Sequence, residues 1–575
     1  MNIVICGLVL ITYIVNCVAA EQRTVDSNVG KITGDIRTVK IGPNTADITT
    51  FLGIPYAEPP VGNLRFRKPM KKAKFDNTFV ASEYGASCTQ VHEMYTPDKM
   101  DEDCLFLNIY TPDITESDTK YPVMIFIHGG GFVFGDGKSM NGEKLTAYGK
   151  LVTVSINYRL GPLGFLNTGD DAVDTNNGLR DQHLAIKWVK DNIESFGGDS
   201  NSITIFGESA GSVCVMYQTI YPENEGLFQR AIAESGSANS FWAVTRNPKE
   251  KSISLAEILG CPETSSSKAV VQCLRDFKNT THIALVSNVT GGGFECWGPS
   301  LDDDFVIKDR IDALDHPTAQ QNLIPFKHLD LLMGTTDYDG VVFLLFGEVA
   351  TYFTELESAS TVDEIQQANK KMISSVLKNV FGKDLALELL DAVIFLYSNY
   401  EDPSDELLHK KQIADFATDV AFFVSTATAL EKHAYQNTGS KTYQYEFCDR
   451  HDFQSKDPWI KGALHGDELL YVLGMPEELG FYYEITDEQF TAKWPLATMM
   501  MDYWTNFAKT GDPNSPRKPP VEWREYTSSD KNYLYITSDD IANRKHLNAR
   551  RTAFWTSYVP KLIKNTGGNH WSHKN

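Results

Sequence analysis

Positive charge is scarce in this chain: its 575 residues hold 53 Lys and Arg against 75 Asp and Glu, which gives a formal net charge of −22. No local cluster of Lys and Arg offsets this balance. Such a surface repels a polyanion unless a basic patch receives it, so we expect no nucleic-acid partner. The sequence also shows no cluster of metal-ligating side chains, and we expect neither a metal nor a cofactor.

Linkers and repeats are absent as well. A length of 575 residues suggests several domains by simple division, but no Ser-, Gly- or Pro-rich linker and no repeat marks a boundary. Short β-rich apolar runs alternate with longer helical segments, which predicts the α/β class with a mostly parallel central sheet flanked by helices. We expect residues 21–575 to form a single large domain with long insertions. The expected strands are 123–127, 152–156, 203–206, 329–333 and 443–447, and the expected helix is 184–193.

After residue 20, no run is long and apolar enough to cross a bilayer. The first 20 residues carry no charged side chain, and Val18-Ala19-Ala20 places small residues just before polar sequence. This pattern predicts a secretory signal peptide over residues 1–20, with an uncleaved membrane anchor as the alternative. The polar end, Gly567 to Asn575, has neither a GPI-type tail nor a retention signal. We therefore expect a secreted, extracellular protein whose mature chain has no membrane span.

Cysteine is sparse, with nine residues, and signal-peptide removal takes Cys6 and Cys17 away. The odd number that is left includes at least one free thiol. The pairs Cys88/Cys104 and Cys261/Cys273 are each closely spaced in loop-like sequence, and in an oxidising compartment each pair could close a short loop. Cys214 lies on an expected helix, and we expect it to be a buried thiol.

Two N-x-[ST] sequons, at Asn279 and Asn288, lie close together in polar sequence. On the secretory route such triplets accept glycans on surface loops. Both are predicted glycosylation sites.

Gly207-Glu208-Ser209-Ala210-Gly211 carries the strongest chemical signal. It follows the apolar run 203–206 and precedes a segment, 210–217, that can start a helix. This is the context of a serine nucleophile elbow, in which a tight turn lifts the hydroxyl clear of the sheet and flanking glycines avoid a Cβ clash. Alone, the motif also arises as an ordinary Gly/Ser turn, so its weight depends on what accompanies it.

A second glycine motif, His128-Gly129-Gly130-Gly131-Phe132, directly follows the expected strand 123–127. Successive glycines free the backbone to point N–H groups into a cavity, as a tetrahedral oxyanion requires. A flexible glycine turn is the plain alternative, but the downstream G-x-S-x-G favours an oxyanion hole. Gly130, Gly131 and Ala210 are the expected donors.

A serine nucleophile needs a base, and the base needs an orienting acid. His465 lies in a glycine-flanked loop, Gly462 to Gly466, after the expected strand 443–447. Asp339 lies just beyond the strand 329–333, and the chain order Ser209, Asp339, His465 is that of α/β-hydrolases. The pattern alone leaves Asp337 as a rival for the acid, because an Asp before a loop is often only a cap or turn former and either residue could have that role.

Several longer segments match signatures of one family in the right order: Phe51-Leu52-Gly53-Ile54-Pro55-Tyr56-Ala57, Glu102-Asp103-Cys104-Leu105-Phe106-Leu107-Asn108, Asn157-Tyr158-Arg159-Leu160-Gly161 and Gly207-Glu208-Ser209-Ala210-Gly211-Ser212. Over nearly all of its mature length, the chain resembles the type-B carboxylesterase/cholinesterase family, and most of all secreted insect carboxylesterases. The resemblance implies an α/β-hydrolase fold, a small-molecule ester substrate and no cofactor. Oligomeric state is not implied.

The resemblance also implies roles for individual residues. Ser209 is the nucleophile, His465 the base and Asp339 the acid, although the family more often has Glu at the acid position. The remaining matches are the oxyanion donors Gly130, Gly131 and Ala210, a buried network of Glu208, Ser235 and Glu468, the disulfides Cys88–Cys104 and Cys261–Cys273, and the structural ion pairs Arg65–Glu102 and Arg159–Asp181.

These roles predict hydrolysis of carboxylic esters through an acyl-enzyme intermediate. Trp242 matches an acyl-pocket position, where a bulky residue favours smaller acyl groups, although a lone Trp is as often core packing. The Cys88–Cys104 loop contains no Trp, which argues against choline esters, since their ammonium group needs an aromatic face. Hydrolysis of juvenile hormone or of odorant and pheromone esters is the alternative, but hormone esterases usually have Gln where Glu208 stands.

An alternative of another class is a catalytically silent adhesion or binding protein on the same scaffold, as in neuroligin-like relatives. Fold alone does not decide between the two, because function depends on the site. Those relatives typically lack the nucleophile and carry a transmembrane segment, whereas this chain has every triad candidate. We therefore expect an enzyme.

Overall fold

The structure is a computed structural model that describes residues 21–93, 95–112, 120–290, 297–321, 323–345, 347–435, 439–450, 459–474 and 487–565. The predicted signal peptide, Cys296, the side chain of Asn288 and the polar C-terminus lie outside the described residues.

The strands are β1 (Gln22–Ser27), β2 (Gly30–Ile41), β3 (Asn44–Pro55), β4 (Phe79–Val80), β5 (Ser87–Cys88), β6 (Met100–Asp101), β7 (Phe106–Pro112), β8 (Tyr121–Ile127), β9 (Val152–Ile156), β10 (Gly198–Glu208), β11 (Arg230–Glu234), β12 (Asp330–Thr336), β13 (Thr442–Phe447), β14 (Asn532–Ile536) and β15 (Ile541–Lys545).

The α-helices are α1 (Glu143–Gly149), α2 (Gly161–Phe165), α3 (Asn177–Asn192), α4 (Ala210–Ile220), α5 (Pro248–Ile258), α6 (Ser267–Asp276), α7 (Thr280–Thr290), α8 (Lys308–Leu314), α9 (Val341–Leu344), α10 (Gly347–Ser358), α11 (Val362–Phe381), α12 (Lys383–Leu396), α13 (Glu406–Thr418), α14 (Val424–Tyr435), α15 (Asp467–Val472), α16 (Asp487–Thr510), α17 (Ala549–Ala553) and α18 (Val559–Asn565).

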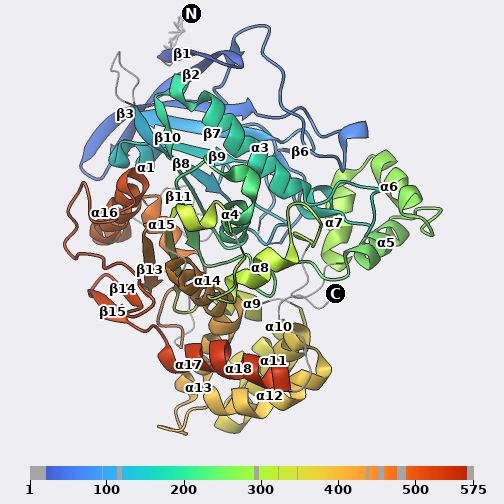
Figure 1. Ribbon diagram of the computed structural model, residues 1–575, viewed down its shortest axis with the longest axis vertical. Coiled ribbons are helices and arrows are strands. Elements are labelled where there is room, and N and C mark those ends of the chain that lie inside the picture. The colour runs from blue at the N-terminus through green and yellow to red at the C-terminus, as the bar shows by residue number, and fades with distance from the viewer. Residues whose placement is uncertain are drawn as a thin grey trace, which may run out of the picture.

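In the described residues a 13-stranded sheet runs through the molecule in the order β1-β2-β3-β7-β9-β8-β10-β11-β12-β13-β14-β15, with β4 beside β2, and β5 and β6 form a separate two-stranded sheet (Figure 1). From β9 to β14 every neighbouring pair is parallel. The pairs from β1 to β9 along one edge and the pair β14–β15 at the other are antiparallel, while β4 pairs with β2 in parallel. The predicted α/β class and mostly parallel sheet are confirmed. Four of the expected strands fall within observed ones, and the fifth, 329–333, begins one residue before β12. The expected helix 184–193 is the second half of α3 with its following turn.

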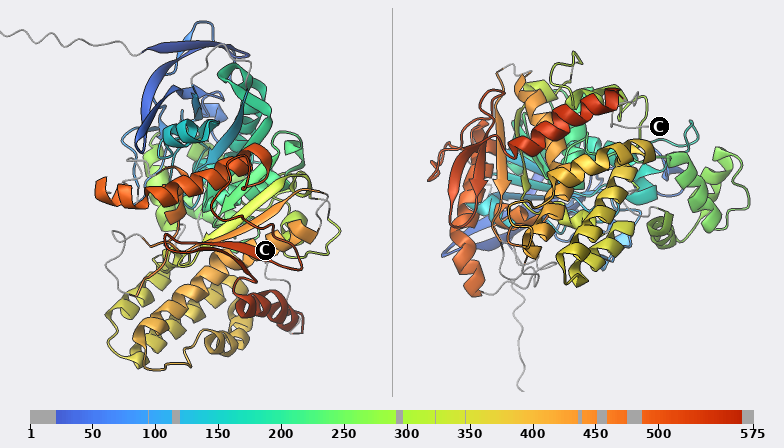
Figure 2. Two further views of the ribbon diagram at one scale, coloured as in Figure 1. Left: turned by 90° about the vertical axis from the view of Figure 1, so that its left-hand side faces the viewer. Right: turned by 90° about the horizontal axis from the view of Figure 1, so that it is seen from below.

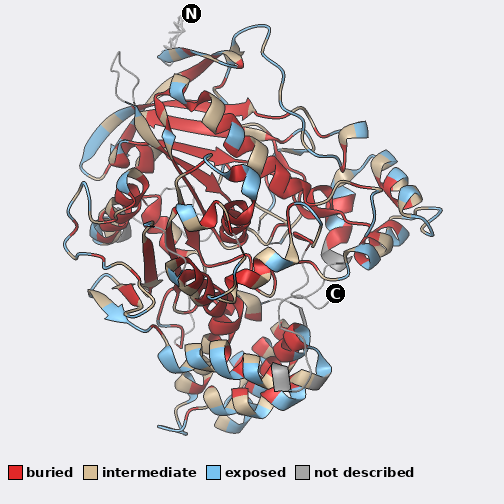
Figure 3. Ribbon diagram, viewed as in Figure 1, coloured by how far each residue is buried: buried red, intermediate tan, exposed pale blue. Residues whose placement is uncertain are grey.

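The alternation of side chains along β8 explains why helices cover both faces of the sheet. Val123, Ile125 and Ile127 pack into the core that α3, α4 and α14 cover, while Met124 and Phe126 pack into the core that α1 and α16 cover. Successive side chains of a strand point to opposite faces, so a strand that is apolar throughout must be buried on both sides. Figure 3 shows the resulting buried centre.

A group of helices, α10 to α13 with α17 and α18, gathers at the end of the molecule opposite the N-terminal strands (Figures 1 and 2). Except for α17, which has no buried residue, these helices share a hydrophobic core of their own, which reaches Tyr338 beside the candidate acid. In the described part of the chain, one helical stretch, Glu406–Tyr435, is long and apolar enough to cross a membrane, but 89% of its most apolar window is buried inside the protein. The division into domains stays a prediction.

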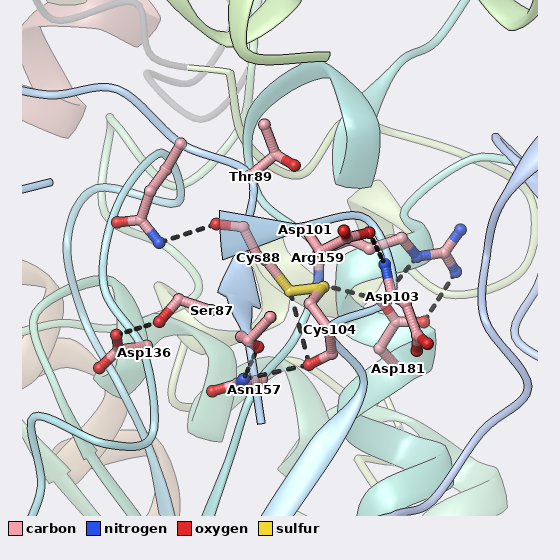
Figure 4. The surroundings of a disulfide bond; sticks show 12 residues. Ser87, Cys88, Thr89, Asp101, Asp103, Cys104, Asp136, Asn157, Arg159 and Asp181 are labelled. Atoms are coloured by element: carbon pink, nitrogen blue, oxygen red, sulfur yellow. Dashed lines mark hydrogen bonds and ion pairs between the residues drawn. A yellow bond between two sulfur atoms is a disulfide. The ribbon is translucent and has the colours of Figure 1, made fainter. Parts of the chain in front are cut away.

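Both predicted disulfides form: Cys88–Cys104 closes a separation of 16 residues and Cys261–Cys273 one of 12. Cys214 is a buried free thiol, as expected, and Cys448 is also free. The two expected ion pairs form as well, Arg65–Glu102 at 2.5 Å and Arg159–Asp181 at 2.7 Å. Figure 4 shows the second pair beside the Cys88–Cys104 bridge.

Candidate active site

Ser209 occupies the sharp turn between β10 and α4. Its backbone has φ 59° and ψ −126°, a conformation that residues with a side chain rarely adopt. The turn passes so close to β8 that a Cβ on Gly207 would lie 2.5 Å from the carbonyl oxygen of Ile127, and one on Gly211 only 2.1 Å away. Both glycines of the motif are therefore required by space, and the strand–turn–helix context predicted for the elbow is observed.

His465 lies in the loop between β13 and α15 and contacts both partners assigned to it. Its Nε2 is 2.8 Å from the Oγ of Ser209, and its Nδ1 is 2.5 Å from the Oδ1 of Asp339. Ser209, Asp339 and His465 follow the carboxyl ends of β10, β12 and β13, which lie at one edge of the parallel sheet. The topology thus brings three distant segments into a single hydrogen-bonded chain.

Asp339 is fully buried and its second carboxylate oxygen is also bonded. Oδ2 accepts hydrogen bonds from the Ser235 hydroxyl at 2.6 Å and from the Thr336 N–H at 3.2 Å. The rival Asp337 turns the other way: its Oδ1 accepts the Ala463 N–H at 2.8 Å, two residues before the histidine. Of the two carboxylates, only Asp339 is hydrogen-bonded to the imidazole.

The glycine motif after β8 lies directly beside the elbow. Gly130 and Gly131 have φ values of 94° and 59°, which favour glycine, and a Cβ on Gly130 would lie 2.1 Å from the carbonyl oxygen of Phe134. Among the hydrogen bonds of the described residues, none uses the N–H of Gly130, Gly131 or Ala210. These donors are thus available to an oxyanion beside Ser209.

Gln90 fixes the far end of this candidate oxyanion loop, 128–136, and was not identified from the sequence. Its side-chain carbonyl accepts the Gly135 N–H at 2.8 Å, and its amide donates to the carbonyls of Gly135 and Cys88, each at 2.9 Å. One residue on, Asp136 accepts the Ser87 hydroxyl at 2.5 Å (Figure 4). The segment that the Cys88–Cys104 disulfide closes is therefore tied to the loop that carries the candidate oxyanion donors.

Glu208, Ser235 and Glu468, which were predicted to form a network, all lie buried near the candidate triad, together with a further carboxyl, Glu234. The parallel register places Glu208 beside Glu234, at matching positions of β10 and β11. Glu234 accepts the indole N–H of Trp504 at 2.5 Å, and Glu468 accepts the Tyr445 hydroxyl at 3.1 Å. No local motif marks Glu234; only the strand register could have identified it.

Burial and mutual charge shift the titration of these groups. Burial lowers the pKa of His465, but the carboxylates of Glu208, 3.1 Å from Nε2, and of Asp339 outweigh it and raise that pKa to about 9. Burial also raises the pKa of Glu208 to about 7 and that of Glu468 to about 8, and it raises the pKa of Glu234 well above its ordinary value. The site thus stabilises a positive charge on the imidazole.

Four aromatic rings lie beside the triad. Trp242 is 6.1 Å from the ring of Phe132 in the oxyanion loop, 5.6 Å from Phe343 and 5.7 Å from Phe422. Phe422 in turn lies 4.6 Å from the imidazole of His465. The sequence identified only Trp242, because the other three rings come from separate segments that the fold brings together.

The two sequons have different settings. Asn279 is exposed, and its side-chain carbonyl accepts the His282 N–H at 3.0 Å at the start of α7. Asn288 lies within α7, so the prediction of a loop is wrong for this position. The reason is that Ile283 and Val286 pack against a hydrophobic cluster and hold the segment as a helix.

Within the described ranges, no group of three or more His, Cys, Asp or Glu side chains is placed to hold a metal ion.

Comparison with known proteins agrees with this geometry. A model of the carboxylesterase family matches residues 21–555. The chain belongs to this family. It is similar to bile salt-activated lipase from Homo sapiens, with 33% identity over 94% of the chain and 70% of the relative, and to that from Rattus norvegicus, with 34% identity over 92% and 84%. It is also similar to Neuroligin-2 from Mus musculus, with 32% identity over 94% and 68%.

Proposed function

We propose that this member of the carboxylesterase family is a secreted serine esterase that hydrolyses carboxylic esters of small molecules. The observation that carries the proposal is the hydrogen-bonded chain from Asp339 through His465 to Ser209, with distances of 2.5 and 2.8 Å. A serine hydroxyl is a weak nucleophile until a base accepts its proton. In this hydrogen-bonded series His465 is the base and Asp339 the acid that orients it.

In the proposed first step, Ser209 Oγ attacks the ester carbonyl while its proton passes to His465 Nε2. The carbonyl electron pair moves onto oxygen, and the N–H groups of Gly130, Gly131 and Ala210 stabilise the negative charge. When the C–O bond to the alcohol breaks, His465 returns the proton to the leaving oxygen. A water molecule then repeats the sequence on the acyl-enzyme and releases the acid and Ser209.

The charge distribution of the site supports this sequence. The imidazole becomes positive as Oγ attacks, and the carboxylates of Asp339 and Glu208 both lie within 3.1 Å of its nitrogens. They stabilise the imidazolium in the transition state more than the neutral ring in the ground state, and only such differential stabilisation accelerates the chemical step.

Relatives named as lipases support ester chemistry, and the similarity to Neuroligin-2 keeps a catalytically silent binding protein as the second candidate. The predicted signal peptide and the two disulfides support secretion. A narrower version of the same proposal limits the substrate class to juvenile hormone or odorant and pheromone esters, following the resemblance to insect carboxylesterases.

The decisive test is turnover. We expect the purified protein to hydrolyse p-nitrophenyl esters with burst kinetics and to be inactivated by an organophosphate. Ser209→Ala should lower kcat by about 10⁵-fold or more, because the nucleophile and its proton transfer are lost together. Equal inactivity of the wild type and Ser209→Ala, with both folded by circular dichroism, would favour the silent binding protein.

A further inference from the structure

A polar cavity of about 190 Å³ lies beside Asp337, the carboxylate that does not bond to His465. It is enclosed by the carboxyl ends of β12, β13 and β14 and by residues of α13 and α17. Lys411, Cys448 and Arg551 line it and are half-buried, so the cavity is open to solvent. Since a water molecule takes about 30 Å³ in the liquid, this space is large enough for a small organic molecule.

The register of the sheet places a row of three side chains along one wall of this cavity. Thr335 of β12 pairs with Glu446 of β13, and Glu446 pairs with Tyr535 of β14. Residues that lie opposite each other on neighbouring strands point to the same face of the sheet, and all three line the cavity. The fold thus brings a hydroxyl, a carboxylate and an aromatic ring together, although no local motif marks them.

Two members of this row have no hydrogen-bonding partner in the described part of the chain. The Glu446 carboxylate accepts no hydrogen bond and makes no ion pair, and the hydroxyl of Thr335, a residue only 3% exposed, makes no hydrogen bond. The Ala463 N–H occupies Oδ1 of Asp337, so Oδ2 remains an acceptor. Buried polar groups are nearly always hydrogen-bonded, because burial removes their hydration. These groups therefore point to a polar ligand.

The two cations of the cavity are already paired with other carboxylates. Lys411 forms an ion pair with Asp415, and Arg551 pairs with Asp415 at 3.3 Å and with Asp419 at 2.6 Å. Among the described residues, neither cation makes an ion pair with Glu446. The groups left over are acceptors that carry negative charge, so the complementary ligand is a cation with hydrogen-bond donors.

The titration of the two carboxyls agrees with this sign. Burial raises the pKa of Asp337 and that of Glu446 to about 7, and the charge of Asp337 adds to the effect at Glu446. A cation beside these groups favours their charged forms and lowers both pKa values again.

We propose that this cavity is a binding site for a small primary amine, bound as the ammonium ion. The three N–H donors of an ammonium group match three acceptors, namely the Glu446 carboxylate, Oδ2 of Asp337 and the Thr335 hydroxyl. Tyr535 and Phe423 line the same cavity and offer apolar surface to the organic part of the ligand. The volume is well below the roughly 300 Å³ of a small drug pocket, so this part is about the size of a butyl or benzyl group.

The test is isothermal titration calorimetry of the full chain with n-butylamine in phosphate buffer at pH 8, where the amine is charged as a lysine is. We expect a dissociation constant on the order of 1 mM. Butan-1-ol, which has the same shape but no charge, and sodium chloride should give no comparable heat. Tetramethylammonium, which carries the charge but no N–H donor, should bind at least about tenfold more weakly.

Two variants place the amine in this cavity rather than beside the triad. Glu446→Gln should weaken butylamine binding at least about tenfold, because a charge-assisted hydrogen bond is lost. Thr335→Val, which keeps the shape and removes the hydroxyl, should weaken it about threefold. Glu401→Gln, at an exposed carboxylate of the helical end, is the matched control and should bind as the wild type does.

The proposal is wrong if butylamine does not bind, if butan-1-ol binds as tightly, or if Glu446→Gln binds as tightly as the wild type. Circular dichroism and melting temperature establish that each variant is folded. If Glu446→Gln does not fold, Thr335→Val decides, and unchanged binding in that variant overturns the proposal. No ester is present in these titrations, so their outcome is independent of the proposed hydrolysis.

Discussion

At the scale of single residues, the candidate acid is the assignment that the geometry sharpens most. Asp337 and Asp339 lie two positions apart, but only Asp339 bonds to the imidazole, and Asp337 bonds to the backbone of Ala463. We expect Asp339→Asn to lower kcat about 10⁴-fold, because the amide favours the wrong tautomer of His465. Asp337→Asn should retain most of the activity. Steady-state kinetics decide, and the opposite order would assign the acid to Asp337.

Glu208 offers a prediction about pH. Its carboxylate lies 3.1 Å from Nε2 and helps to raise the pKa of His465 to about 9. The base must be neutral to accept the serine proton, so activity falls as the pH drops through this pKa. In Glu208→Gln the pKa of His465 falls, and the acid limb of kcat/KM should move about one unit lower in pH.

The same substitution should lower the pH-independent kcat about tenfold, because the imidazolium of the transition state loses a neighbouring charge. Glu223→Gln, on the surface, serves as the control and should keep the wild-type profile. An acid limb that does not move in Glu208→Gln would show that Glu208 is not ionised beside the histidine.

Candidate residues could be named from the sequence more readily than their surroundings. Ser209 and the glycine donors were inferred from glycine motifs in a strand–turn–helix context, and His465 from its glycine-flanked loop; their roles stay predictions. Phe422 and Glu234 were not predicted, and the reason is physical. A buried Phe within an apolar helix and a Glu at a strand end look ordinary locally, and only the packing of distant segments and the register of β10 with β11 give them their neighbours.

At the scale of elements, the elbow between β10 and α4 stores backbone strain. Ser209 has φ 59° and ψ −126°, whereas Ser212 lies within the regular helix α4. Glycine tolerates the first conformation better than alanine, and alanine tolerates a helix better than glycine. We expect the free energy of unfolding of Ser209→Gly to be about 1 kcal/mol higher than that of Ser209→Ala.

At Ser212 the order should reverse, with the glycine variant about 1 kcal/mol less stable than the alanine variant. Urea denaturation of the four variants measures both differences. An elbow at which alanine is the more stable substitution would mean that the turn is not strained in solution.

The order of strands was less predictable than their existence. Apolar runs located β8, β9, β10, β12 and β13, because strands buried on both faces are apolar throughout. β1 and β2, near the edge of the sheet, contain many exposed or half-buried residues and gave no comparable signal. Their pairing depends on contacts between distant segments.

At the scale of the whole molecule, we expect both disulfides to stabilise the fold but only Cys88–Cys104 to affect kcat. Each closes a short loop and should contribute about 3 kcal/mol to stability by restricting the unfolded chain. Only the segment closed by Cys88–Cys104 is tied to the oxyanion loop, through Gln90 and Gly135. Replacing both cysteines of this pair by serine should lower the melting temperature and also lower kcat about tenfold.

The second pair is the internal control. Replacing Cys261 and Cys273 by serine should lower the melting temperature to a similar extent but leave kcat within about twofold of the wild type, since this segment includes most of α6, at one side of the molecule (Figure 1). Equal losses of kcat in the two double variants would show that the Cys88–Cys104 bridge has no specific effect on catalysis.

The hydrogen bond between Ser209 and His465 joins positions 256 residues apart. A chain made from its N-terminus therefore contains the candidate nucleophile long before the candidate base exists, and the candidate acid enters between them. Ser209 gains its imidazole partner only when β13 joins the sheet and brings the histidine loop over the elbow. Any measurement of the proposed hydrolysis would therefore also report that this C-terminal part of the sheet has folded.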